Sequence, residues 1–288
     1  MQRITVTMVT GKEKIMSNTK QMKSEKILLD HGSGGKISHR LTADLLLPAF
    51  DNPVLAQLDD GAVLNLAGGR LAFSTDTYVV DPIFFPGGSI GDLAVNGTVN
   101  DVAMCGATPL YLSVAMIIEE GFSMDDLQRV VADLGSAARL AGVTVVTGDT
   151  KVVPKGAADR IFINTAGIGV IAEGINVAGA NARSGDKIIL SGTMADHGMT
   201  ILTQRQGLTF ESEIESDSAP LNHMVADVLK SGCDVHVLRD PTRGGVGTTL
   251  NEIAGQSQAG IRIYEAHLPI RPDVAGVCDL LGFDPLYV

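Results

Sequence analysis

The stretch STDTYVVDPIFFPGGSIGDLAVNGTVNDVAMCGATP, residues 74–109, decides how this chain folds. It begins at the end of a predicted strand, RLAFSTD at 70–76, and continues into a predicted helix from Ser89 to Cys105, along which apolar residues recur near one face. Gly106 is expected to end this helix. The nearly continuous apolar run PLYLSVAMII that follows at 109–118 predicts a strand covered on both faces.

Strands and helices continue to alternate after this stretch. Ser123 is expected to begin a second helix, because Asp125 and Asp126 in its first turn complement the helix dipole. The residues predicted to form the buried stripe of this helix are Leu127, Val130, Val131, Leu134, Ala138 and Ala141. Residues 143–153 and 160–172 then predict two more strands.

A second unit is predicted to begin after Glu173-Gly174, where the pattern of predicted elements changes. Its predicted elements are strands at 185–192 and 260–265, helices at about 197–205, 219–230 and 272–281, and the loop RDPTRGG (239–245) ahead of a further helix. We therefore expect an α/β (α+β) protein of two domains, 25–174 and 175–288, preceded by a flexible extension at residues 1–24.

Composition restricts the classes of function. A formal charge of −11, from 33 acidic against 22 basic residues, disfavours a nucleic-acid-binding surface, because such surfaces neutralise phosphates with Lys and Arg. The three cysteines, Cys105, Cys233 and Cys278, have the spacing of neither a disulfide framework nor a zinc site, which favours a reducing cytoplasm. No run of about 18 apolar residues occurs, so no membrane span is predicted.

Aspartates recur where predicted strands or glycine turns end. They are Asp59 and Asp60 before Gly61, Asp76 in Ser-Thr-Asp-Thr, Asp101 after Asn100, and Asp149 in Gly-Asp-Thr-Lys. Each alone is by default a turn residue that satisfies nearby backbone amides. Ligand sites gather at strand ends, however, and carboxylates suit Mg²⁺ that also binds substrate phosphates. The recurrence therefore favours a metal–nucleotide site.

A polar stripe runs along the helix predicted at 89–105. Asp92, Asn96 and Asn100 recur at four-residue spacing and therefore share one face, with Asp101 beside them. A solvated stripe on an amphipathic helix is one interpretation. The short amide and carboxyl side chains, without Lys or Glu, equally suit a ligand or an interface.

Glycine-rich and basic segments are further candidates for phosphate binding. The segment HGSGG at 31–35 exposes several backbone N–H groups suited to phosphate oxygens, although no Walker A pattern is present; the alternative is a flexible loop. Lys151 is either a surface residue or a group that neutralises phosphate charge. In RDPTRGG, Arg239, Asp240 and Arg243 precede a helix N-terminus that favours anions, or pair internally to shape the turn.

Five stretches carry a resemblance to a known family. They are DHGSGG (30–35), LDDGAVL (58–64), the stretch 74–109, TGDTKVV (147–153) and RDPTRGGVGTTLNEIA (239–254). On these motifs the chain resembles the PurM-like, or phosphoribosylaminoimidazole-synthetase-like, ATP-binding superfamily. Within that superfamily it resembles the HypE family, the carbamoyl dehydratases of nickel–iron hydrogenase maturation.

The resemblance implies a two-domain PurM-like fold whose N-terminal domain dimerises through its sheet. ATP with Mg²⁺ would lie in a cleft between the domains and close to the dimer interface. The implied ATP-binding residues are Asp59, Asp60, Asp76, Asn100, Asp101 and Asp149, with His31, Gly32, Gly34 and Gly35 of the loop over the phosphates. The implied metal ligands among them are Asp59, Asp76, Asp101 and Asp149, and the implied catalytic residue is Lys151.

The resemblance also implies a reaction and partners. The reaction is the ATP-dependent dehydration of an S-carbamoyl group to a thiocyanate, which supplies the cyanide ligand of the hydrogenase iron. The implied partners are a second copy of the chain, the carbamoyltransferase HypF and the HypC–HypD complex, with neither nucleic acid nor membrane.

The chain departs from the family pattern at its end. In the family the acceptor cysteine is the last residue, preceded by an Asn-Glu-Gly segment with a candidate catalytic glutamate, whereas this chain stops at Val288 without either. We therefore expect a second domain incomplete at its C-terminus and a chain inactive on its own. Cys278 lies in a predicted helix beside Leu280 and Leu281, which indicates packing.

Two other functions are the alternatives. A selenophosphate synthetase would need a cysteine near the N-terminal glycine loop, and residues 1–104 contain none. A non-catalytic scaffold, in which nucleotide binding supports a dimer that docks other maturation proteins, would need no acceptor cysteine at all.

Overall fold

The computed structural model describes residues 35–50, 52–208 and 214–288. The predicted extension at residues 1–24 lies outside the described residues, as do His31, Gly32 and Gly34 of the predicted phosphate loop. Gly35 is the first residue of α1. Before the first strand the described elements are α1 (Gly35–Leu41), η2 (Thr42–Leu46), α2 (Leu47–Phe50) and η3 (Leu55–Gln57).

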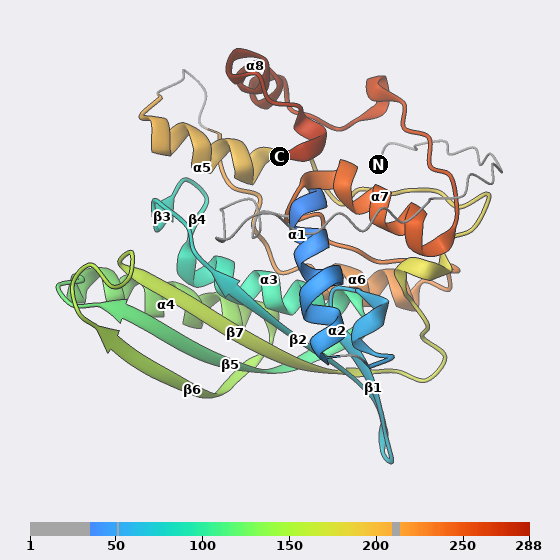
Figure 1. The fold of residues 1–288 in the computed structure, drawn as a ribbon, viewed down its shortest axis with the longest axis horizontal. Coiled ribbons are helices and arrows are strands. Elements are labelled where there is room, and N and C mark those ends of the chain that lie inside the picture. The colour runs from blue at the N-terminus through green and yellow to red at the C-terminus, as the bar shows by residue number, and fades with distance from the viewer. Residues whose placement is uncertain (1–34, 51, 209–213) are drawn as a thin grey trace.

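A five-stranded sheet forms the base of the molecule (Figure 1). Its strands are β1 (Ala62–Leu66), β2 (Gly69–Tyr78), β5 (Ala107–Glu119), β6 (Thr144–Val153) and β7 (Ile161–Ile171), in the spatial order β1-β2-β7-β5-β6. All neighbours pair antiparallel except β5 and β6. The four strands predicted between residues 70 and 172 are confirmed, although β2 extends two residues beyond Asp76.

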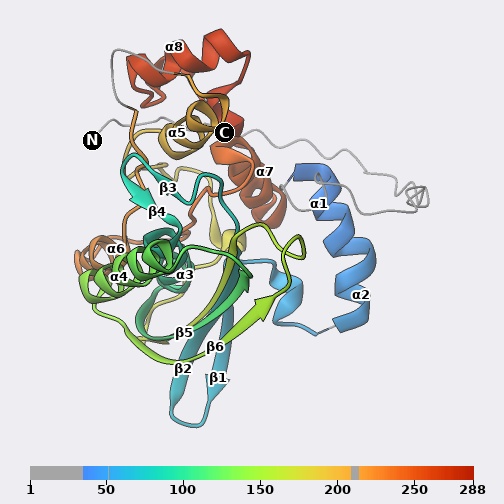
Figure 2. The same cartoon turned by 90° about the vertical axis from the view of Figure 1, so that its left-hand side faces the viewer.

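Two helices cover one face of this sheet: α3 (Ile90–Met104) and α4 (Met124–Ala141) (Figure 2). Ser89 begins α3 in a capping box with Asp92, and Ser123 caps α4, as its position predicts. A Cβ at Gly91 would clash with the carbonyl oxygen of Val130, so this glycine lets the two helices approach closely. The predicted stripe of α4 is wrong at Val131, which is exposed, because that position turns away from α3.

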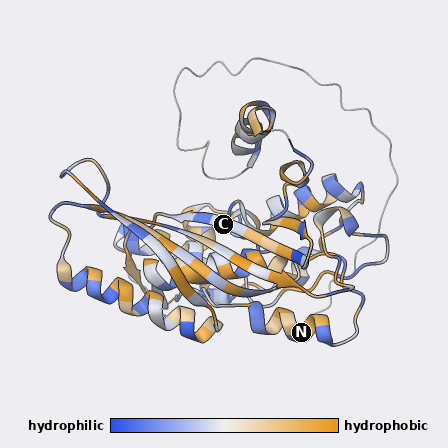
Figure 3. Cartoon of the chain, turned by 90° about the horizontal axis from the view of Figure 1, so that it is seen from below, coloured by the Kyte–Doolittle hydropathy of each residue, from blue (hydrophilic) through white to orange (hydrophobic). Residues whose placement is uncertain are grey.

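The opposite face of the sheet is open. Phe73, Ile168 and Tyr111 lie in one row across β2, β7 and β5, and each is more than 40% exposed. Alternate residues such as Ala72 and Leu112 are buried beneath the helices. Figure 3 views the strands from this side, where they lie in front of the helices. The strand predicted at 109–118 to be covered on both faces is therefore covered on one face only within a single chain.

The second unit packs on top of α3 as a set of helices (Figure 1). Its elements are η4 (Gly179–Asn181), α5 (Asp196–Gln206), α6 (Asn222–Lys230), α7 (Gly245–Ser257), η5 (Glu265–His267), α8 (Pro272–Leu281) and η6 (Pro285–Tyr287). The helices predicted in this unit are confirmed. The predicted strands at 185–192 and 260–265 are not formed, because a strand requires a hydrogen-bonded partner and neither segment pairs with one among the described residues.

The polar stripe of α3 binds a segment of the second unit, residues 214–222. Asn96 Nδ2 donates to Ser218 Oγ at 3.1 Å. Asn100 donates to the carbonyl oxygen of Ala219 at 3.0 Å and accepts from the amide of Leu221 at 2.8 Å. The stripe is therefore an interface within the chain, and its amides replace the water that the main chain of this segment would otherwise bind.

No helix in the described ranges combines the length and the apolar character needed to cross a bilayer. The remaining described elements are the short strands β3 (Phe84–Phe85) and β4 (Gly88–Ser89), which pair antiparallel just before α3.

Candidate functional site

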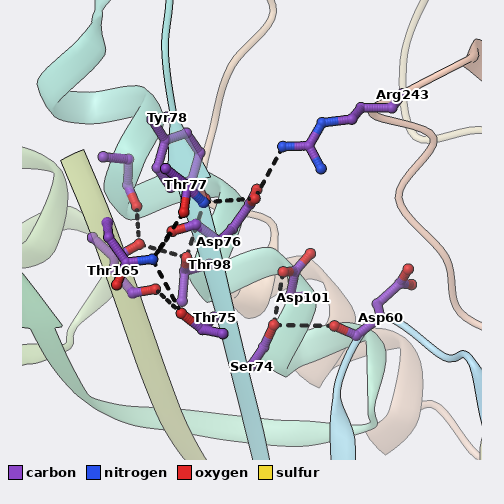
Figure 4. A network of polar contacts seen from close by, with 12 residues as sticks. Asp60, Ser74, Thr75, Asp76, Thr77, Tyr78, Thr98, Asp101, Thr165 and Arg243 are labelled. Carbon is purple, nitrogen blue, oxygen red and sulfur yellow. Dashed lines mark hydrogen bonds and ion pairs between the residues drawn. The ribbon is translucent and has the colours of Figure 1, made fainter. Parts of the chain in front are cut away.

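Three of the predicted aspartates meet on the helix-covered side of β2. Ser74 Oγ lies 2.8 Å from Asp101 Oδ2 on α3 and 3.0 Å from the carbonyl oxygen of Asp60, which precedes β1 (Figure 4). Asp76 lies two residues beyond Ser74 and therefore projects to the same side of the strand. The sequence prediction that Asp60, Asp76 and Asp101 share one region agrees with this geometry.

The RDPTRGG loop places two cations against these acids from the second unit. Arg239 Nε lies 2.6 Å from Asp60 Oδ1, and another nitrogen of its guanidinium lies 2.7 Å from Glu252 Oε2 on α7. Arg243 contacts Asp76 Oδ1 at 3.0 Å (Figure 4). These arginines pair with acids elsewhere in the chain, so the loop is not shaped by the internal Arg–Asp pairing that was the alternative interpretation.

The carboxyl groups gathered here are strongly perturbed. Burial, and then the charge of Asp240, raise the pKa of Asp60 to about 8 and that of Asp101 to about 9. Burial also raises the pKa of Asp240 to about 6, although its own backbone amide and Arg239 oppose the shift. Carboxyl groups that raise one another's pKa in this way are short of positive charge.

Two carboxylate oxygens in this cluster have no partner. Asp60 Oδ2 and Asp240 Oδ2 are buried and accept no hydrogen bond. Because a buried acceptor without a donor is costly, their arrangement fits a cation that binds between the two units. No three acidic, imidazole or thiol side chains in the described ranges converge closely enough to hold a metal alone. An ion bound there would therefore need further ligands, such as phosphate or water oxygens.

Buried hydroxyl groups form a hydrogen-bond network beside the acids. Tyr78 Oη lies 3.1 Å from Thr98 Oγ1, which lies 2.6 Å from Thr165 Oγ1 (Figure 4). Thr165 donates in turn to the carbonyl oxygen of Ala94 at 2.9 Å. This network joins β2, α3 and β7, and it fixes the strand from which Ser74 and Asp76 project.

Other predicted site residues lie apart from this cluster. Asp149 and Lys151 are exposed on β6, and the strand register places Asp149 in one row with Ala115, Asn164 and Thr77. That row lies on the open face, opposite to Asp76 and with two strands between β6 and β2. Within one chain, therefore, Asp149 and Lys151 do not approach the other acids.

Asn100 and Asp59 are engaged by main chain. Both polar atoms of the Asn100 amide bond to residues 219 and 221, as described above. Asp59 Oδ1 accepts from the amide of Gly179 at 3.1 Å. A role of Asn100 in ATP binding stays a prediction, but its amide already holds the two units together.

The sequence did not indicate Glu252 or the hydroxyl network as parts of the site. It placed Asp240 with Arg239 and Arg243 in a candidate phosphate-binding loop, but not among the predicted metal ligands. Thr98 and Thr165 gave no signal, because a threonine on a buried face is ordinary in a helix or strand.

Comparisons with known proteins agree with this architecture. Residues 58–171 match the AIR synthase related protein, N-terminal domain, and residues 183–288 match the AIR synthase related protein, C-terminal domain. The carbamoyl dehydratase HypE of Cupriavidus necator is 53% identical over 268 residues, which are 93% of this chain and 76% of the relative.

Solved structures are also similar to this chain. A crystal structure of the hydrogenase maturation protein HypE in complex with ATP is 60% identical, has a TM-score of 0.75, and covers 91% of this chain and 78% of that one. The crystal structure of a HypE–HypF complex is 49% identical, has a TM-score of 0.82, and covers 86% of this chain and 80% of that one.

Proposed function

Because this chain belongs to the HypE family of carbamoyl dehydratases, within the AIR synthase related proteins, we propose that it uses ATP and Mg²⁺ to dehydrate a carbamoyl group carried on a thiol. The observation that carries this proposal is the cluster of Asp60, Asp101 and Asp240. The pKa of each is raised, and Asp60 and Asp240 each have a buried oxygen without a partner, so the cluster lacks a cation. The ATP complex of a relative that is 60% identical supports the choice of nucleotide.

We assign the metal–triphosphate site to the acids on both sides of the junction between the units. Asp60, Asp76 and Asp101 face it from the first unit, and Asp240 faces it from the second. Asp59 stays a predicted ligand beside them. Mg²⁺, when bound there, would neutralise phosphate charge and hold the triphosphate for in-line displacement. Arg239 and Arg243 would orient the acids and supply positive charge at the rim.

The proposed reaction makes an amide oxygen a good leaving group. The carbamoyl oxygen attacks the γ-phosphorus, the bond between that phosphorus and the β,γ-bridging oxygen breaks, and ADP leaves. The nitrogen loses one proton, so that an imidate phosphate forms. Loss of the second N–H proton then expels inorganic phosphate and leaves a thiocyanate. The oxygen of the carbamoyl group departs in the phosphate, so the reaction balances as a dehydration at the expense of one ATP.

We further propose a homodimer that pairs through the open face of the sheet. The apolar row of Phe73, Ile168 and Tyr111 is exposed there, which is unusual for a sheet face in water. Asp149 and Lys151 lie on the same face, and we assign their predicted roles in ATP binding and catalysis to the dimer rather than to one chain. The domain boundaries near residue 174 and cytoplasmic localisation are retained as parts of the same proposal.

HypF is the partner that the comparisons favour, since a relative forms a HypE–HypF complex. The HypC–HypD complex is a further proposed partner, which would receive the product. A role in hydrogenase maturation unites these proposals.

Isothermal titration calorimetry of ATP in the presence of Mg²⁺ tests the site. We expect Asp76→Ala or Asp101→Asn to abolish Mg²⁺-dependent ATP binding, whereas Asp125→Ala on the exposed start of α4 leaves it unchanged. Size-exclusion chromatography with light scattering should give the same dimer for all variants. ATP affinity like that of the wild type in both site variants would refute the assignment.

The reaction itself is tested with a synthetic peptide that contains an Asn-Glu-Gly segment and ends in S-carbamoylcysteine. Mass spectrometry should detect an ATP-dependent loss of one water from the peptide, together with release of phosphate. Tight ATP binding without this loss would favour the alternative of a non-catalytic scaffold.

A further inference from the structure

The turn that presents Asp59 and Asp60 has an unfavourable backbone conformation. Leu58 ends η3 with φ 53° and ψ 33°, the left-handed region in which the Cβ of a non-glycine residue crowds its own backbone. Its amide donates to the carbonyl oxygen of Leu55 at 3.2 Å, which closes the turn. Something outside the turn must therefore stabilise this conformation.

Side chains of the second unit supply that support. Gln256 on α7 donates from Nε2 to the carbonyl oxygen of Gln57 at 3.1 Å and to that of Leu58 at 3.4 Å. Arg239 donates to the same Leu58 oxygen at 3.4 Å while its Nε holds Asp60. Both carbonyl groups are thus fixed from α7 and the loop before it.

The Gln256 side chain is itself held in place. A Cβ at Gly179 would clash with Gln256 Oε1, so the amide fills the space that this glycine leaves open. The amide of Gly179 donates to Asp59 Oδ1 at 3.1 Å. Gln256 Oε1 is buried without a donor, so the hydrogen bonds of this side chain are made by Nε2 alone. Its role is therefore concentrated on the two carbonyl groups of the turn.

We propose that Gln256 is a positioning residue of the nucleotide site: its amide holds Leu58 in the left-handed conformation that aims Asp59 and Asp60 at the junction between the units. The inference rests on the proposed function for its importance to ATP, but the geometry of the turn stands without nucleotide. When Gln256 is removed, Leu58 relaxes to negative φ, and the two carboxylates rotate away from Asp101 and Asp240.

The test combines Gln256→Met, which keeps the length of the side chain and removes its donor, with Leu58→Gly. Glycine adopts the left-handed conformation freely, so Leu58→Gly should make the turn independent of Gln256. Gln128→Met, on the exposed side of α4, is the matched control. The readouts are hydrogen exchange of the Leu58 amide in nucleotide-free protein and the Kd for ATP with Mg²⁺.

We expect Gln256→Met to raise the exchange rate of the Leu58 amide and to weaken ATP binding about tenfold, the equivalent of the energy that separates left-handed from right-handed leucine. The double variant should bind within about threefold of the wild type, because glycine removes that energy difference. Leu58→Gly alone and Gln128→Met should bind as the wild type does.

Two results would overturn the inference. One is unchanged exchange and affinity in Gln256→Met; the other is weak binding that Leu58→Gly fails to restore, which would show that Gln256 acts elsewhere. If Gln256→Met does not fold, Leu58→Gly decides alone, because its loss of affinity would mean that the left-handed turn is not what the site needs. If wild-type protein binds no ATP, the proposed function fails, while hydrogen exchange still decides the role of Gln256.

Discussion

Asp240→Asn should stabilise the protein in the absence of metal while removing the stabilisation that Mg²⁺ confers. Burial and the Asp240 charge hold the pKa of Asp60 and of Asp101 at about 8 and about 9, far above the value of about 3.9 for an unfolded chain. The folded state therefore retains protons that the unfolded state has lost. The stabilisation from these neutral carboxyl groups is complete at acidic pH and declines as pH rises from about 4 towards 8 or 9.

The magnitude follows from proton linkage. One proton retained by the folded state alone lowers the free energy of unfolding by about 1.4 kcal/mol for each pH unit. Counting a single shared proton for the cluster, the wild type should lose about 2 kcal/mol between pH 6 and pH 7.5. Burial, the largest cause of both shifts, remains in the variant, but asparagine at residue 240 removes the charge that raises both pKa values next, so the variant should lose less than the wild type.

Urea denaturation with EDTA at both pH values, followed by circular dichroism, measures the difference. Asp125→Asn, which changes the same charge on the exposed start of α4, is the control and should follow the wild type. Adding Mg²⁺ with ATP should stabilise the wild type and not Asp240→Asn. The reasoning is wrong if Asp240→Asn has the same pH dependence as the wild type, or if it is less stable by an equal amount at both pH values.

Three further predictions concern other parts of the molecule. Asn100→Asp loses the donor to the carbonyl oxygen of Ala219 and should cost about 1–3 kcal/mol of unfolding free energy in urea titrations. Asn65→Asp, at an exposed position of β1, should cost little. Equal effects would contradict the role of the polar stripe of α3. Gly247→Ala places a Cβ 2.9 Å from the Tyr287 ring and should cost about 1–3 kcal/mol of unfolding free energy, seen as a lower Tm. Gly255→Ala on the same helix meets no neighbouring atom and should be neutral or stabilising. A Tm unchanged by Gly247→Ala would contradict the packing of η6 on α7. Iodoacetamide should label exposed Cys233 first, because burial raises the pKa of Cys105 to about 12 and also raises the pKa of Cys278. Peptide mapping that finds Cys105 labelled in native protein would refute this.

The first unit was largely predictable because its signals are local. Ser89 and Ser123 cap their helices, and the apolar run at 109–118 is a strand, since capping and periodicity act over a few residues. What the run could not predict is that Tyr111 and Ile117 face an open surface. A residue's exposure depends on which elements cover the sheet, and that is decided far along the chain.

The candidate site was predictable in part for the same reason. Asp60, Asp76 and Asp101 stood out through their glycine turns and strand positions, and the fold brings them together. The pairing of Arg239 with Asp60 joins residues far apart in sequence, and no local pattern encodes it. The predicted strands at 185–192 and 260–265 did not form, because a local sequence pattern shows that a segment can pair, not that a partner lies beside it.

The amide stripe of α3 also bears on how the chain is made. The carbonyl oxygen that Asn100 binds belongs to Ala219, 119 residues later in the sequence. At bacterial and eukaryotic synthesis rates of about 5–20 residues per second, the stripe of a chain leaving the ribosome waits about 6–24 s for its partner. An apolar stripe exposed for so long would invite aggregation, whereas asparagine side chains are hydrated in the meantime. The polar character of this interface thus protects the nascent first unit until the second unit arrives.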